Sequence, residues 1–167
     1  MNRTLIGACL LAAATAHTPA HAQGESMVTY RMLSPETALE VAQATQQSCR
    51  DAGYQVAVAV VDRMGIAQVT LRDRFAGPHT PDTAWRKAWT AVSFRSDTQS
   101  LSDRIGAGQM PSSLQDITNA LMLGGGVPIE AGGSIVGAVG VSGAPAGDLD
   151  DKCARAGIAT VQDKLNM

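Results

Sequence analysis

The 167-residue sequence predicts a single α+β domain, in which helices pack on an antiparallel sheet. Two pairs of strand-like segments are each joined by a short turn, which favours hairpins over crossover connections. Helical segments precede, separate and follow these pairs. No linker or low-complexity run interrupts them, and about 145 residues after a leader fit one domain.

The first half of the chain predicts a helix followed by a hairpin. The helix begins at Ser34-Pro35, with serine as N-cap and proline at the first helical position, and ends at Gly53. Its inward residues recur at helical spacing, namely Ala38, Val41, Ala42, Thr45 and Cys49. The valine and alanine run 55–61 predicts a central strand. A turn at 62–65 then leads to a partner strand at 66–72.

The middle of the chain predicts two helices and a less regular segment. Thr80-Pro81 repeats the cap-then-proline pattern and opens a helix through Phe94. One face of this helix carries Ala84, Ala88, Ala91 and Val92. A capping box at 96–99 opens a shorter helix that ends before Gly106. Residues 106–123 are expected to form a flap or linker, with a helical turn or two within 112–121.

A glycine-rich hairpin is the most distinctive feature of the sequence. Strands are predicted at 127–130 and 134–142, joined by a tight turn at 131–133. Glycine inside a strand allows a close approach to the backbone, by a ligand, a helix or a second subunit. Asp148 is then expected to cap a last helix, whose inward residues are Leu149, Cys153, Ala156 and Val161.

The N-terminus has the pattern of an export signal. Arg3 is followed by an apolar stretch at 5–16 and by the A-x-A site Ala20-His21-Ala22. We therefore expect residues 1–22 to be a signal peptide and 23–167 to be a mature domain that is periplasmic or secreted. The apolar stretch is too short to cross a bilayer, and no later segment reaches about 18 apolar residues, so no membrane span is expected.

The charge pattern argues against one class of partner, and the cysteines suggest a disulfide. The 13 basic and 15 acidic residues form no block of either sign, so nucleic acid is not an expected partner. An oxidising compartment permits Cys49 and Cys153 to form a disulfide if their helices lie side by side. Two buried, unpaired thiols are the alternative.

His79 is the main candidate for chemistry, because it is the single histidine after residue 22. It precedes a helix N-terminus and has cations nearby in the sequence, namely Arg72, Arg74, Arg86 and Lys87; these surroundings suit a carboxylate-bearing ligand. One histidine suffices as an axial ligand of haem iron or as a general acid or base, whereas a structural zinc site needs more ligands. A loop histidine bonded to backbone is the alternative.

Other motifs are absent or ambiguous. The sequence has no G-x-S-x-G, H-E-x-x-H, C-x-x-C or G-x-x-x-x-G-K motif, and Gly124-Gly125-Gly126 leads into a strand rather than a helix. Met64, Met110 and Met122 are candidates for a second axial iron ligand, or fill gaps in the core. Trp85 and Trp89 share a helix face and either wall a flat ligand or pack on the sheet or at a subunit interface.

Several segments together resemble the GlcG/HbpS-like haem-binding family. They are 56–65, 72–80 with its Gly77-Pro78-His79-Thr80, 86–91, 124–129 and 137–143, and the resemblance extends over 33–165. It implies a profilin-like α+β domain that assembles into homo-oligomers. It also implies haem as cofactor, and in some members haem degradation or redox-linked sensing.

The resemblance also assigns site residues. It implies that His79 is the iron ligand, and that Thr80, Arg86 and the glycines Gly124, Gly125 and Gly126 form the pocket wall. These residues predict an exported haem-binding protein. The alternative is an enzyme acting on a small organic acid, with His79 as general acid or base and Arg72 or Arg86 holding the carboxylate.

Overall fold

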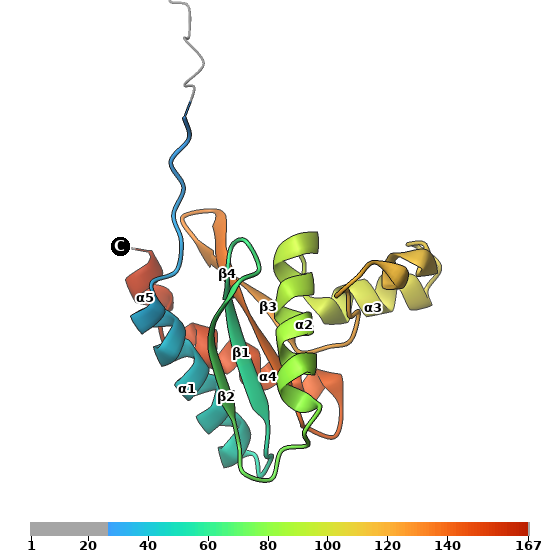
Figure 1. Cartoon of the computed structure of the whole chain (residues 1–167), viewed down its shortest axis with the longest axis horizontal. Coiled ribbons are helices and arrows are strands. Elements are labelled where there is room, and N and C mark those ends of the chain that lie inside the picture. Colours follow the sequence, from blue (N-terminus) through green and yellow to red (C-terminus); the bar gives the residue numbers. More distant parts are fainter. Residues whose placement is uncertain (1–26, 167) are drawn as a thin grey trace, which may run out of the picture.

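The structure is a computed structural model that describes residues 27–166, and it contains one four-stranded antiparallel sheet with helices on both faces (Figure 1). The strands are β1 (Ala57–Asp62), β2 (Ala67–Arg72), β3 (Gly126–Ala131) and β4 (Ser134–Ser142), in the order β2-β1-β4-β3. The helices are α1 (Pro35–Asp51), α2 (Thr80–Phe94), α3 (Thr98–Gly106), the short 3₁₀ helix η1 (Ser112–Asp116), α4 (Gly147–Ala159) and α5 (Gln162–Leu165). The predicted α+β class is confirmed.

The predicted signal peptide, residues 1–22, lies outside the described residues. Within the described part of the chain, no helix is both long and apolar enough to cross a membrane.

The two faces of the sheet differ in the size of their side chains. On β1, Val58 and Val60 point to one face and join the main core formed with α1 and α4. Ala57 and Ala59 point to the opposite face, where they contact Ala84 of α2. This alternation follows from the period of two along a strand. Figure 1 shows α1 and α4 on one side of the sheet and α2 on the other.

Glycines in β3 and β4 allow α2 to lie unusually close to the sheet. A Cβ added to Gly140 would lie 1.9 Å from the carbonyl oxygen of Ala84, and one added to Gly126 would lie 2.4 Å from that of Lys87. Between strands, a Cβ on Gly137 would lie 2.5 Å from the carbonyl oxygen of Val61. Of the alternatives left open by the sequence, the close approach of a helix therefore explains Gly126 and Gly140.

Helices α1 and α4 pack side by side and are joined covalently. Cys49 and Cys153 form a disulfide with their Cα atoms 5.4 Å apart. Gly157 permits the same close contact, because a Cβ there would lie 1.8 Å from Oγ1 of Thr45. The paired alternative for the two cysteines is the one that the structure contains.

Three helix starts differ from the expected ones. His79, not Thr80, is the N-cap of α2. Asp97, not Ser96, caps α3, because the backbone N–H of Ser96 still donates to Ala91 at the end of α2. The N-cap of α4 is Ala146, so that Asp148 falls inside the first turn.

The buried face of α4 also differs from the expected one. Cys153 and Val161 are buried and Leu149 is half-buried, but Ala156 is exposed. The face toward α1 and the sheet is instead made by Asp150, Cys153, Ala154, Gly157 and Ile158, at spacings of three and four residues.

The glycine packing predicts a position-specific loss of stability. Gly140→Ala should lower the free energy of unfolding by about 1–3 kcal/mol, because α2 must move off the sheet to admit the methyl group. Gly106→Ala is the matched control, since nothing lies within 4 Å of its added Cβ. Urea unfolding of both variants measures the difference, and equal midpoints would contradict the packing account.

The disulfide predicts a large dependence of stability on reductant. Its cysteines are 104 residues apart, so its reduction should lower the free energy of unfolding by about 5 kcal/mol in the chain-entropy model. Denaturant unfolding with and without dithiothreitol measures this loss. Superimposable curves, or reactive thiols in the unreduced denatured protein, would show that the bridge is absent.

Candidate ligand-binding site

A cavity of about 740 Å³ opens where the start of α2 meets the loop between β4 and α4. Its volume is within the usual range of ligand sites, roughly 300–1,000 Å³. We call it the His79 cavity. It is lined by Gly53, Tyr54, Gln55, Phe75, Gly77, His79, Thr80, Thr83, Arg86, Lys87, Leu121, Leu123, residues 142–147 and Asp150. Three of the predicted site residues, His79, Thr80 and Arg86, are thus brought together.

His79 presents a free imidazole to this cavity. The turn that carries it is fixed by the buried hydroxyl of Thr80, which donates to the carbonyl of Gly77 at 2.8 Å, and by Thr83, which donates to the carbonyl of His79 at 3.0 Å. The ring lies against Gly77, where an added Cβ would be 2.7 Å from Cε1. Within residues 27–166 the imidazole makes no hydrogen bond, so its nitrogens remain available to a ligand.

Arg86 lines the cavity and also holds one of its walls in place. Its Nη2 donates to the carbonyl of Ala120 at 2.9 Å, and its Nε donates to that of Asn119 at 3.5 Å. Thr90 strengthens the same connection by accepting the N–H of Leu121 at 2.8 Å. Arg86 therefore ties α2 to the segment that returns from η1.

The inner end of the cavity contains a buried ion pair. Nζ of Lys87 lies 2.9 Å from Oδ2 of Asp150, and the side chains are 1% and 4% exposed. The same ammonium donates to the carbonyl of Val141 at 2.9 Å, while Oδ1 of Asp150 accepts the N–H of Ala144 at 3.0 Å. Burial raises the pKa of Asp150, although Lys87 and the backbone donors act in the opposite direction.

Asp150 was missed by the sequence analysis. A signal was present, because Asp150 precedes Cys153 by three residues and Ala154 by four. That spacing places an acidic residue on the buried face of a helix, where carboxylates rarely occur without a partner.

The predicted glycine wall lies behind the cavity. Gly124, Gly125 and Gly126 do not line it; a Cβ on Gly125 would lie 2.7 Å from Cβ of Asp150 and 3.1 Å from Nζ of Lys87. Gly125 has a φ of +115°, which favours glycine on its own account. Gly125 therefore makes room for the ion pair, whereas Gly124 lies against the backbone of Gly147 and Gly126 against that of Lys87.

The remaining candidates lie elsewhere. Arg72 and Arg74 are not among the lining residues, and Arg72 donates to the carbonyl of Ala76. Met122 is buried and Met110 half-buried in an apolar cluster with Leu101, while Met64 is exposed in the β1–β2 turn. None of the three methionines reaches the cavity.

Both tryptophans pack within the fold. Trp85 contacts the alanine face of the sheet, and Trp89 packs against the cluster around Leu101. Trp89 also covers Gly65, whose added Cβ would lie 2.8 Å from Cδ1. The packing alternative for the tryptophan pair is the one that the structure shows.

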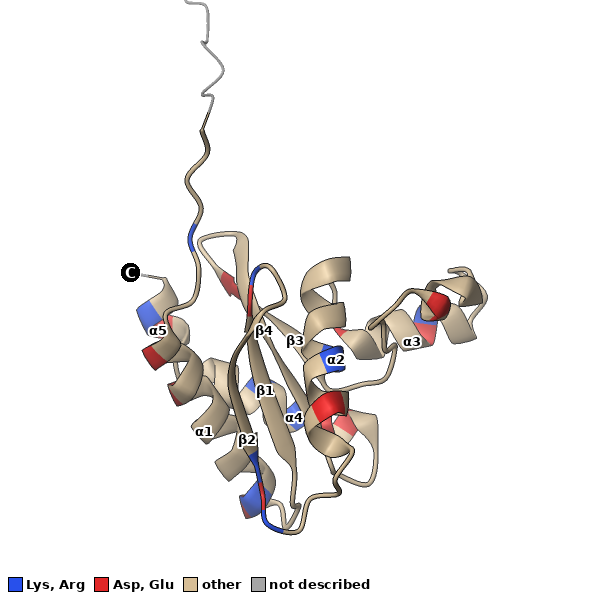
Figure 2. Ribbon diagram, in the orientation of Figure 1, with Lys and Arg blue, Asp and Glu red and all other residues tan. Residues whose placement is uncertain are grey.

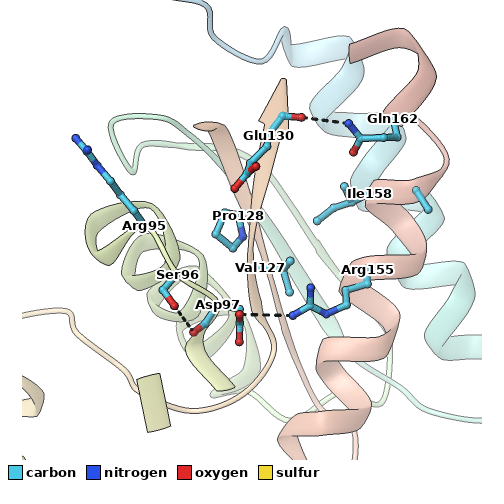
Figure 3. Close-up of a pocket in the computed structure, with 10 residues that line it drawn as sticks. Arg95, Ser96, Asp97, Val127, Pro128, Glu130, Arg155, Ile158 and Gln162 are labelled. Atoms are coloured by element: carbon cyan, nitrogen blue, oxygen red, sulfur yellow. Dashed lines mark hydrogen bonds and ion pairs between the residues drawn. The ribbon is translucent and has the colours of Figure 1, made fainter. Parts of the chain in front are cut away.

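A second cavity, of about 630 Å³, lies at the β3 edge of the sheet (Figure 3). Its polar groups are joined to one another: Arg155 pairs with Asp97 at 3.7 Å, and Gln162 donates to the carbonyl of Glu130 at 3.3 Å. Figure 3 shows Arg95 pointing away from the others. Because Asp97, Arg155 and Gln162 are already bonded within the fold, this cavity is a weaker candidate than the His79 cavity.

The wider electrostatics add little to either cavity. Figure 2 shows Lys and Arg interspersed with Asp and Glu over the helices and loops. In residues 27–166, no group of three or more His, Cys, Asp or Glu side chains is placed to hold a metal ion.

Comparison with known proteins identifies the family. A family model described as "Haem degrading protein HbpS-like" matches residues 33–159. The chain belongs to this HbpS-like family. The resemblance given by the glycine hairpin and by Gly77-Pro78-His79-Thr80 is thus confirmed.

Solved structures of similar proteins share this fold. A double mutant of HbpS from Streptomyces reticuli is 42% identical, with a TM-score of 0.77 over 87% of this chain and 98% of HbpS. A complex of PduOC with haem is 28% identical, with a TM-score of 0.71 over 77% of this chain and 94% of PduOC. A 15.0 kDa protein from the dhaT-dhaS intergenic region of Citrobacter freundii is 33% identical over 109 residues, which cover 64% of this chain and 76% of the relative.

The raised pKa of Asp150 predicts a pH dependence of stability. As the pH rises above 3.8, the Asp150 carboxyl loses its proton in the unfolded state before it does so in the native state. The native state then binds more protons than the unfolded state. The contribution of Asp150 to the free energy of unfolding therefore falls as the pH rises. The Asp150→Asn variant lacks this titrating carboxyl group, so its stability does not depend on that proton. The free energy of unfolding of the wild type should therefore fall relative to that of the variant, until the pH exceeds the native pKa.

Urea unfolding of both proteins across the acidic range measures this difference. A constant difference at every pH would show that burial leaves the titration of Asp150 unchanged.

Proposed function

We propose that the protein is an exported haem-binding protein that holds haem in the His79 cavity, with His79 as an iron ligand. The observation that carries the proposal is a free imidazole on the wall of a cavity large enough for a cofactor. The proposal makes it a binding protein for haem handling or redox sensing rather than an enzyme.

The residues of the cavity fit the chemistry of haem. Haem combines a flat apolar ring with two carboxylate side chains. Phe75, which is 79% exposed, and Leu121 and Leu123 offer apolar surface. Arg86 and Lys87 offer positive charge on the inner wall. Bound haem would supply a redox-active iron at His79.

The relatives support the same proposal. PduOC was solved in complex with haem, and the family model carries a haem-related description.

Export is the second part of the proposal. It is supported by the signal pattern at 1–22 and by the Cys49–Cys153 disulfide, because disulfides persist in oxidising compartments. A periplasmic or secreted location follows, and the family resemblance extends the proposal to a homo-oligomer.

Haem titration tests the proposal directly. Addition of haem to the purified protein should produce a Soret band, and His79→Ala should lose or shift that band because an axial ligand is removed. Gln115→Ala, an exposed change in η1, is the control and should behave like the wild type.

The outcomes separate two claims. An unchanged spectrum in His79→Ala would exclude His79 as the iron ligand while leaving haem binding intact. A wild type without a Soret band would contradict the proposed function itself.

A further inference from the structure

Burial of the Lys87–Asp150 pair carries a large desolvation free energy for a small domain. Removing two charges from water costs several kcal/mol for each ion, and mutual attraction often only offsets this cost. Replacing a buried ion pair by apolar residues of similar size commonly leaves the stability of a protein unchanged or raises it. Both residues nevertheless line the His79 cavity, with side chains that are only 1% and 4% exposed.

The hydrogen bonds of Lys87 leave one donor unused. Its ammonium has three N–H donors, of which one is directed to Asp150 and one to the carbonyl of Val141. Within residues 27–166 the third has no partner. Asp150 is held in turn by the N–H of Ala144, so the ammonium is fixed by groups that are themselves anchored.

The cavity is cationic at this end. Lys87 and Arg86 contribute two positive charges and Asp150 one negative charge, which leaves one net positive charge among the three. Gly147, at the N-terminus of the 13-residue helix α4, lines the same end and adds the positive end of a helix dipole. An anionic group would be stabilised here.

The separation of Lys87 from His79 suits one extended ligand. Eight residues along α2 correspond to about 12 Å of helix axis. A ligand that contacts both His79 and Lys87 must therefore extend over a comparable length. The anionic group that meets Lys87 would then lie at the periphery of the ligand.

We propose that the Lys87–Asp150 pair is the carboxylate-recognition element of the His79 cavity, in which Lys87 donates its third hydrogen to a ligand carboxylate and Asp150 positions the ammonium. The inference rests on the proposed function: the ligand is haem, bound with a propionate toward Lys87. Lys87 is the binding residue and Asp150 the positioning residue.

Comparison of haem with haem dimethyl ester tests this assignment, because esterification removes the carboxylate charge and leaves the ring and iron unchanged. The wild type should bind haem about tenfold or more tightly than the ester, as expected for a charge-assisted hydrogen bond. In Lys87→Met/Asp150→Asn the preference should disappear. Asparagine retains an acceptor for the N–H of Ala144, and methionine fills the space of the lysine stem.

The exposed pair Lys152–Asp148 on α4 provides a matched control. Its ions lie 3.5 Å apart with side chains 72% and 60% exposed, and neither residue lines the cavity. Lys152→Met/Asp148→Asn removes the same charges and should keep the wild-type preference for haem over the ester.

The results distinguish the two proposals. A Soret band with an undiminished preference in Lys87→Met/Asp150→Asn would overturn the role of the pair and leave haem binding standing. A wild type that binds neither compound would overturn both. If circular dichroism shows that this variant is unfolded, Lys87→Gln/Asp150→Asn, which keeps a donor for the carbonyl of Val141, makes the same comparison.

Discussion

The close contact between α2 and the small-residue face of the sheet is the constraint on which the rest of the structure depends. Ala57, Ala59 and Gly140 leave room for the helix backbone itself to approach the strands, because a Cβ added to Gly140 would lie only 1.9 Å from the carbonyl oxygen of Ala84. In such packing a single methyl group has no space. Because His79, Arg86 and Lys87 all belong to α2 or to its cap, this contact also determines where the candidate ligand groups lie.

The contact of α2 with the sheet also explains why the charged Lys87–Asp150 pair lies inside the domain. Gly125 and Gly126 bring the start of β3 against Lys87, and α4 brings Asp150 to it from the other side of the sheet edge. The disulfide fixes α4 against α1 three residues beyond Asp150. The cavity is thus built by segments far apart in the sequence, and its inner wall is positioned by the core packing rather than by a flexible loop.

The sequence predicted most of the fold because its signals were local. Ser34-Pro35, Thr80-Pro81 and the turn at 131–133 each mark an element through their own conformational preferences. Every residue predicted to face inward on α1 and α2 is buried, but the polar residues buried with them, such as Gln46 and Lys87, were not predicted. The family was also recognisable. The site was predicted only in part: His79 and Arg86 line the cavity, but the anchoring role of Arg86 toward Ala120 depends on a contact across 34 residues. The Lys87–Asp150 pair, 63 residues apart, required the tertiary structure for the same reason.

The central claim is that haem occupies the His79 cavity, with α2 as its platform. A crystal structure of the haem-loaded protein tests it most directly. We expect iron bound to the imidazole of His79, the ring against Phe75 and Leu123, and a propionate at Lys87. Haem bound in the cavity at the β3 edge, or held without His79, would contradict it.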